Sequence, residues 1–343
     1  MKSPRAQSAA QKQIDKRIVR DRESDAFDDV AIRFIERDQK QKGKRCWKET
    51  ARLLGLRETE DGELATIPDG IVARWRSRQI QDITKRDVID CLDRIVDRGA
   101  GVLANRTLAA IRRLFNWCLE KDILTVSPAA RVKAPTDETS RERVLSDDEI
   151  RLFWNACGKV GFPFGDAAKM LLLTGQRRSE VSGMTRDEIK FDVWTIPRER
   201  TKNKRSHQVP LSRSALAVLK SAPDTGNFIF LIRGDAPIQG WSLAKTEIDE
   251  LMLEAAGEKA KIEPWRLHDL RRTVASGMAR IGVPLPVIEK CLNHASGSFA
   301  GIVGVYQRHT FEAEMRQAFE DWAATVEKIA SGKPASVIRM RRA

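Results

Sequence analysis

The sequence has almost no tyrosine: Tyr306 is the only one, although the 343 residues include 12 Phe and 8 Trp. A phenol has a reference pKa of about 10, so it acts as a nucleophile at neutral pH only beside cationic groups. Tyr306 lies in the segment Val305-Tyr306-Gln307-Arg308-His309, which contains such groups. Taken alone, Tyr306 is either a packing residue whose hydroxyl bonds to the backbone or a reactive residue.

Cysteine is scarce as well, and long apolar runs are absent. The five cysteines are scattered and never spaced as Cys-x-x-Cys, which indicates reduced thiols rather than a disulfide framework. Cys291-x-x-His294 is half of a metal-binding pattern, but no second pair follows it, so we expect no metal site and no cofactor. No apolar run approaches about 18 residues, and the N-terminus lacks a signal-peptide core. We therefore expect a cytoplasmic protein with no membrane partner.

Positive charge, in contrast, is abundant. The 61 Lys and Arg residues against 48 Asp and Glu residues give a formal net charge of +13 at pH 7. This balance favours a polyanionic partner, most often nucleic acid, because Lys and Arg neutralise phosphates and release counterions. The chain is long enough for two domains, and 41% of its residues are hydrophobic, which suffices for two cores.

The N-terminal half reads as a basic arm followed by a helical domain. Residues 1–23 are basic with few apolar side chains, and helical periodicity begins at Ser24. A capping box at Thr84–Asp87 opens one helix, and a long helix is predicted over about 104–121. The long helix would bury Leu108, Ile111, Leu114, Phe115 and Cys118. Its other face carries Arg106, Arg112 and Arg113, which form either a solvated face or a surface that follows DNA phosphates.

A segment rich in Pro, Ser and charge predicts a linker over 126–145, between a domain at 24–125 and a second one at 146–330. A second capping box at Ser146–Glu149 opens the latter domain. Residues 331–343 form a basic tail. Two short strands, Val193–Ile196 and Gln208–Leu211, flank a cationic hairpin tip. The expected fold is therefore mainly α with a small antiparallel β-sheet (α+β) in the second domain.

Three further stretches of the second domain carry candidate functional side chains. Arg177 follows a predicted helix that ends at Gly175, and Glu180 is placed to orient its guanidinium. His268 and Arg271 are three residues apart, on one face of a predicted helix, so both can address one phosphate. His294 ends another predicted helix. Each stretch alone also fits an ordinary explanation. Arg177 and Glu180 could form a surface ion pair, the cationic hairpin tip could be a solvated turn, and either histidine could be an ordinary core or surface residue.

The order of these elements resembles the tyrosine recombinase (phage integrase) family, most closely the integrases of prophages and genomic islands. The matching motifs are Leu173–Glu180, Thr201–Asn203 before Val209–Leu211, Leu267–Arg271, Leu292–His294 and Val305–Tyr306. The resemblance covers 146–330 and, more loosely, 24–125, which it identifies as a helical core-binding domain. The sequence departs from the family pattern in two places. Asn293 stands where many members have Gly, and 1–23 is too short for a separate arm-binding domain.

The resemblance implies a role for each candidate residue. Tyr306 would be the nucleophile, and Arg177 and Arg271 would neutralise the scissile phosphate. Lys202 would protonate the leaving oxygen, and His268 and His294 would assist proton removal and donate to the phosphate. Glu180 would support Arg177 or His268. The predicted DNA-binding residues are Arg106, Arg112, Arg113, Lys204, Arg205 and Arg272.

The same resemblance implies double-stranded attachment-site DNA as substrate, a homotetramer on that DNA, and accessory DNA-bending and directionality proteins. The outcome would be integration or excision of a prophage or genomic island. Two alternatives remain at this stage: a type IB topoisomerase-like activity, and a non-catalytic DNA-binding regulator derived from an integrase. The last predicted helix has an apolar stripe, which by resemblance favours packing on a neighbouring protomer; packing on its own domain is the alternative. The stripe consists of Phe311, Met315, Ala318, Trp322 and Val326.

Overall fold

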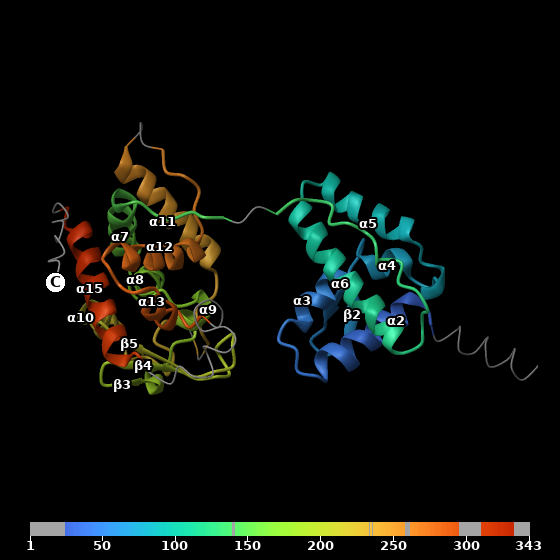
Figure 1. Cartoon of the computed structure of the whole chain (residues 1–343), viewed down its shortest axis with the longest axis horizontal. Coiled ribbons are helices and arrows are strands. Elements are labelled where there is room, and N and C mark those ends of the chain that lie inside the picture. The colour runs from blue at the N-terminus through green and yellow to red at the C-terminus, as the bar shows by residue number, and fades with distance from the viewer. Residues whose placement is uncertain are drawn as a thin grey trace, which may run out of the picture. The chain divides into compact units, whose positions relative to one another are not determined.

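The structure is a computed structural model that describes residues 25–138, 141–232, 234, 236–257, 261–294 and 310–332. The chain divides into two compact units, Met1–Ser140 (the N-terminal unit) and Arg141–Ala343 (the C-terminal unit), each with its own hydrophobic core (Figure 1). The predicted arm 1–23, Tyr306 and almost all of the predicted basic tail lie outside the described residues.

The N-terminal unit is helical apart from one small hairpin. Its strands β1 and β2 pair antiparallel, with Arg57 opposite Ala65. In chain order its elements are α2 (Phe27–Phe34), η1 (Ile35–Lys40), α3 (Trp47–Leu54), β1 (Leu56–Glu58), β2 (Leu64–Thr66), α4 (Ile71–Trp75), η2 (Ile80–Asp82), α5 (Lys85–Asp97) and α6 (Gly101–Glu120).

Two local signals read from this half of the sequence are confirmed, the capping box and the long helix. Thr84 caps α5 and forms a reciprocal capping box with Asp87, which satisfies two backbone donors at the helix start. The long helix is α6, and its predicted stripe is buried in the core. The β1–β2 hairpin was not predicted, because its three-residue strands are too short to show an alternating pattern.

The C-terminal unit is also mainly helical, with a three-stranded antiparallel sheet of order β3-β4-β5. The two predicted strands are confirmed as β4 and β5, and β3 adds a short third strand. Its elements are α7 (Asp147–Val160), α8 (Phe164–Thr174), α9 (Arg178–Ser182), η3 (Arg186–Glu188), β3 (Ile189–Lys190), β4 (Val193–Ile196), β5 (His207–Pro210), α10 (Arg213–Ser221), α11 (Trp241–Ala256), α12 (Leu267–Arg280), α13 (Leu285–Cys291) and α15 (Glu312–Ala330). The predicted fold class, mainly α with small antiparallel sheet, is confirmed.

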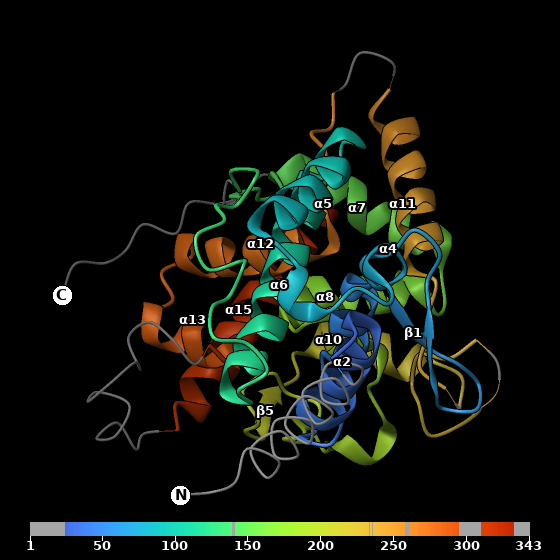
Figure 2. The ribbon, with the colours of Figure 1, turned by 90° about the vertical axis from the view of Figure 1, so that its right-hand side faces the viewer.

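Helix α15 packs on its own unit, which was the alternative to the neighbouring protomer that the resemblance favoured. The Nε1 of Trp322 donates to the Leu172 carbonyl at 2.8 Å, and the Trp322 side chain is fully buried. Gly277 of α12 provides the space, since a Cβ there would lie 2.1 Å from the Trp322 ring. In Figure 1 and in the turned view of Figure 2, α15 lies against the body of its unit. An apolar stripe predicts burial but does not specify the partner, so the sequence left both options open.

Both ends of the segment predicted as a linker pack into the two cores. Ala129 and Val132 are buried in the N-terminal core, where the guanidinium of Arg112 donates to both of their carbonyl groups. Leu145 is buried in the C-terminal core, and its N–H donates to the Thr273 hydroxyl at 3.0 Å. None of the helices in the described part of the chain combines the length and apolarity that crossing a bilayer requires.

Candidate active site

Arg177 sits at a sharp turn between two helices. Helix α8 ends at Thr174, and its C-cap Gly175 adopts the left-handed conformation with φ 62°, a conformation that costs glycine little. Arg177 is then the N-cap of α9. Its N–H and its Nη1 donate to the two oxygens of Glu180, both at 2.8 Å. Of the two predicted partners of Glu180, Arg177 and His268, the structure therefore pairs it with Arg177.

Glu180 is itself held in place by burial and by Arg200. Its side chain is only 1% exposed, and its backbone carbonyl accepts from the guanidinium of Arg200. Arg200 also pairs with Glu188, so it links α9 to the turn η3 before the sheet. Because Glu180 is buried and doubly bonded, it fixes the direction in which Arg177 points.

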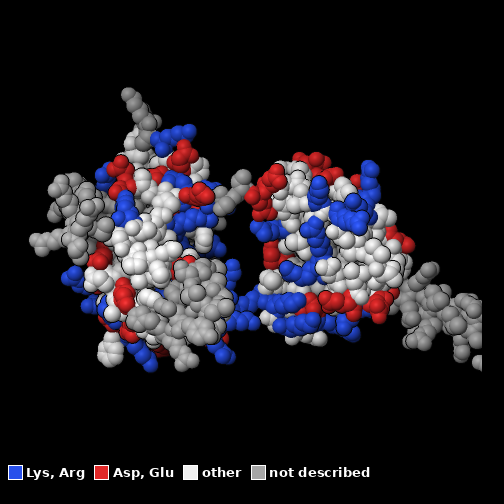
Figure 3. All heavy atoms as spheres, viewed as in Figure 1, with Lys and Arg blue, Asp and Glu red and all other residues white. Residues whose placement is uncertain are grey.

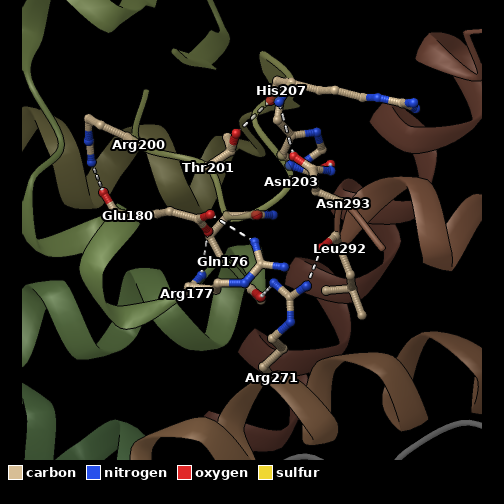
Figure 4. A network of polar contacts seen from close by, with 12 residues as sticks. Gln176, Arg177, Glu180, Arg200, Thr201, Asn203, His207, Arg271, Leu292 and Asn293 are labelled. Carbon is tan, nitrogen blue, oxygen red and sulfur yellow. Dashed lines mark hydrogen bonds and ion pairs between the residues drawn. The ribbon is translucent and has the colours of Figure 1, made fainter. Parts of the chain in front are cut away.

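Arg271 lies on α12 and connects the C-terminal ends of α8 and α13. It is buried, with its Nη1 donating to the Gly175 carbonyl at 2.7 Å and its Nη2 donating to the Leu292 carbonyl. Burial, together with the nearby charge of Arg177, lowers the pKa of Arg271 to about 10, so the group remains charged at neutral pH. A guanidinium has five N–H donors, and these two contacts leave the others for a ligand. Figure 4 shows both guanidinium groups turned toward the same space.

His268 and His294 are exposed residues near these arginines. Shielding of the ring from water by the surrounding protein lowers the pKa of His268, and Arg272 and Arg271 lower it further. The same shielding lowers the pKa of His294, again aided by Arg271 and Arg177. Because both pKa values lie below the usual 6.5, both rings are predominantly neutral at pH 7. A neutral imidazole can accept a proton at one nitrogen and donate at the other.

The residues around Arg177 and Arg271 line an open cleft of about 490 Å³. Gln176, Arg177, His268 and Arg271 all contribute to it, so three of the predicted catalytic side chains share one space. The described lining includes neither Lys202 nor His294. The other lining residues are Arg178, Ser179, Trp241, Ser242, Lys245, Trp265, Arg266 and Leu267.

Lys202 lies on the exposed loop between β4 and β5, where Lys204 and Arg205 are also exposed. The buried Thr201 braces this loop, since its hydroxyl lies 3.1 Å from the Arg198 carbonyl and 2.8 Å from the Arg205 carbonyl. Asn203 connects the loop to the end of α13 through Asn293. The predicted cationic hairpin tip is therefore tied to the segment that carries His294.

The other predicted DNA-binding residues make contacts within the chain. Arg106 pairs with Glu138 at 2.9 Å, and Arg113 donates to the Thr50 hydroxyl at 3.3 Å. Arg272 pairs with the buried Asp269. On the viewed face of the N-terminal unit in Figure 3, Lys and Arg side chains form a column with acidic residues along its upper and lower margins. The DNA-binding role of these arginines stays a prediction.

Three residues at the site were not singled out from the sequence: Gln176, Arg200 and His207. Gln176 is buried and donates to the Cys291 carbonyl at 2.8 Å. His207 is buried on β5, with its Nε2 3.2 Å from the same carbonyl. A carbonyl only accepts, so the neutral ring carries its proton on Nε2. All three act on backbone carbonyl groups or helix ends brought near by the tertiary fold, which leaves no local signal in the sequence.

His207 makes folding stability depend on pH. Burial, with a further contribution from Arg271 and Arg177, lowers the pKa of His207 to about 4, against about 6.5 in an unfolded chain. The unfolded state binds the extra proton between these values, so stability is complete above pH ~6.5 and falls as the pH drops toward ~4. Between pH 7.5 and 4.5 we expect the parent to lose about 2 to 3 kcal/mol more than His207→Asn, by urea unfolding. Equal losses in both proteins would contradict this assignment.

Within the described residues, no group of three or more His, Cys, Asp or Glu side chains is placed to hold a metal ion. The cleft presents several guanidinium groups, those of Arg177 and Arg271 among them, and the imidazole of His268. These suit a phosphate whose charge increases in the transition state.

Comparison with known proteins places this chain in a family. Residues 143–313 match the sequence model of the phage integrase family, and residues 27–135 match that of the phage integrase central domain. The chain is 28% identical over 232 residues to tyrosine recombinase XerD of Bifidobacterium longum, which covers 62% of this chain and 75% of XerD. It is 27% identical over 265 residues to prophage integrase IntZ of Escherichia coli, which covers 74% of this chain and 63% of IntZ.

Solved structures show the same fold. A lambda integrase dimer bound to a COC′ core site superposes with a TM-score of 0.59 at 16% identity, covering 96% of this chain and 84% of that one. A Tn1549 transposon integrase in complex with a circular intermediate DNA also gives a TM-score of 0.59, at 17% identity, covering 84% of this chain and 99% of that one. The chain therefore belongs to the phage integrase family and is a tyrosine-type site-specific recombinase.

Proposed function

We propose that this protein is an integrase that cuts and rejoins DNA through a 3′-phosphotyrosyl link to Tyr306, and so integrates or excises a prophage or genomic island. One observation carries the proposal. Arg177 and Arg271, from different helices, line one cleft together with His268, and Arg271 also bonds to Leu292, two residues before His294. Two fixed cations and a neutral imidazole around one space form a site for a reacting phosphodiester.

The arginines would stabilise the charge that develops during attack. As the Tyr306 oxygen bonds to phosphorus, negative charge builds on the two non-bridging oxygens. Arg177 and Arg271 each hold part of their N–H donors in protein contacts and keep the rest for these oxygens. Because both are held before the substrate arrives, little reorganisation is needed during the reaction.

Protons would be moved by the remaining residues. His268 accepts the phenolic proton of Tyr306, since its lowered pKa leaves a free ring nitrogen at neutral pH. His294 donates a hydrogen bond to a non-bridging oxygen. The bond from phosphorus to the 5′-oxygen breaks, and Lys202 gives that oxygen a proton. The 5′-hydroxyl of a partner strand then attacks the phosphotyrosyl link and releases Tyr306, so the phosphodiester is restored without a cofactor.

Double-stranded attachment-site DNA would be held by both domains, 24–125 and 146–330, joined by 126–145. Related integrases are described in complex with a core site and as a tetramer on a Holliday junction, and we propose a homotetramer on DNA here. Arg106, Arg112, Arg113, Lys204, Arg205 and Arg272 are the proposed DNA contacts. The basic segments 1–23 and 331–343, accessory DNA-bending proteins and directionality proteins would complete the assembly.

A plasmid assay tests the proposed outcome. Genomic DNA flanking the gene supplies candidate attachment sites, recognised as direct repeats, and two copies are cloned in one supercoiled plasmid. We expect recombinant circles of the size set by the distance between the sites. Relaxed plasmid without recombinants would favour the topoisomerase-like alternative, and binding without either product would favour the non-catalytic regulator.

A further inference from the structure

Several side chains bind to the C-terminal end of α13. The Cys291 carbonyl accepts from Gln176 at 2.8 Å, with the His207 Nε2 3.2 Å away, and the Leu292 carbonyl accepts from Arg271. The next residue, Asn293, is bound through its side chain. Its Oδ1 accepts from the Nδ2 of Asn203 at 2.6 Å (Figure 4). This last contact connects the α13 end to the loop that carries Lys202.

The Asn203 amide is held in one orientation. Its Oδ1 accepts from the N–H of Arg205 at 3.2 Å. A backbone N–H can only donate, so this contact identifies the oxygen of the amide, and the other end is the donor. The Oδ1 of Asn203 therefore bonds within its own loop, next to Lys202. The Nδ2 of the same amide donates to Asn293.

Asn293 is suited to receive that bond. Its φ is 51°, in the left-handed region that glycine enters freely and asparagine better than most other residues. Glycine would meet the backbone requirement at lower cost but would offer no side-chain acceptor. The amide is thus what asparagine adds at this position, immediately before His294.

We propose that the bridge between Asn203 and Asn293 is a positioning contact for catalysis, which holds the loop of Lys202 in register with the segment of His294. Without the bridge, the loop between β4 and β5 keeps its fold but is no longer held at a fixed distance from the cleft. The transfer of a proton from Lys202 to the leaving 5′-oxygen therefore slows. This inference rests on the proposed function, specifically on Lys202 as the general acid.

The test compares two nicked substrates that differ in one atom. One has an ordinary scissile phosphodiester, and the other has sulfur in place of the bridging 5′-oxygen. A thiol has a pKa of about 8.5, so the sulfur leaves as a thiolate and needs no proton from Lys202. The variants are Asn203→Ala, Asn293→Gly, the double variant and Lys202→Ala. Asn155→Ala, which removes an exposed amide on α7, is the matched control.

We expect Asn203→Ala and Asn293→Gly to cleave the ordinary substrate about 10- to 100-fold more slowly, because small misplacements of a catalytic group have effects of this size. The double variant should be no slower than the singles, since both remove one contact. On the sulfur substrate the variants should return to within about threefold of the parent, as should Lys202→Ala. Asn155→Ala should match the parent on both substrates.

The possible failures are distinguishable. If Lys202→Ala stays slow on the sulfur substrate, the general-acid role of Lys202 is wrong and the inference falls with it. If sulfur rescues Lys202→Ala but leaves the asparagine variants equally slow, the bridge has a different role and the positioning proposal alone is overturned. Parental rates for Asn203→Ala and Asn293→Gly on the ordinary substrate would overturn it as well.

Discussion

Tyr306→Phe is expected to abolish covalent attachment to DNA. The substitution removes only the oxygen that would attack phosphorus and keeps an aromatic ring of similar size, so DNA binding should persist. Loss of an enzymatic nucleophile typically lowers rates by about 10⁴-fold or more. The measurement uses a nicked attachment site, from which the short 5′-hydroxyl fragment diffuses away and leaves the protein trapped on the DNA. The parent should accumulate the adduct, and the variant should give none.

The single tyrosine makes this result unusually easy to assign. With one Tyr among 343 residues, recovery of phosphotyrosine from acid-hydrolysed, phosphorus-labelled adduct identifies Tyr306 without peptide mapping. Binding of the nicked DNA by Tyr306→Phe, measured in parallel, is the control for folding. An adduct from Tyr306→Phe equal to that of the parent, or phosphoserine in the hydrolysate, would show that another residue is the nucleophile.

Helix boundaries could be predicted where the signal is local. The capping boxes at Thr84 and Ser146 both form as the sequence indicates, because the side chain and the backbone groups that it bonds lie within one turn. The pair β4 and β5 was visible from its apolar residues around a charged tip. The short strands β1 to β3 were not, since two or three residues carry no periodicity.

The candidate site could be predicted as an order of residues but not as a network. Arg177, Arg271 and His268 were recognised by their order in the sequence, and the structure brings them to one cleft. Arg177 is held by the nearby Glu180, but the bonds that hold Arg271 run to backbone carbonyls, one of them at Gly175, 96 residues away. A backbone carbonyl has no sequence signature, so neither this bond nor the role of His207 could be anticipated. The packing of Trp322 against Gly277 could not be predicted either, because it also depends on the tertiary fold.

Arg177→Ala is expected to lower the rate of cleavage about 10³-fold, the loss seen when a charged stabiliser of a phosphoryl transition state is removed. The Arg177 side chain is 23% exposed and lines the cleft, so it can reach the phosphate. Arg177 contributes one phosphate contact among many, so DNA affinity should fall by less than about tenfold. The slope of the logarithm of affinity against the logarithm of salt concentration should become shallower by about one. Single-turnover cleavage and binding at two salt concentrations give the two quantities separately.

The same substitution also leaves Glu180 without its side-chain partner, which costs about 1 to 3 kcal/mol for a buried polar group. Slow cleavage through partial unfolding therefore has to be separated from slow cleavage through chemistry. Glu180→Gln in the Arg177→Ala background removes the unpaired buried charge, so it should recover much of the lost stability without recovering cleavage. Recovery of both would make Arg177 a structural partner of Glu180, and a collapse of DNA binding would make it a docking residue. Persistently slow cleavage in a stable, DNA-binding double variant is the outcome expected of a cation that acts on the reacting phosphate.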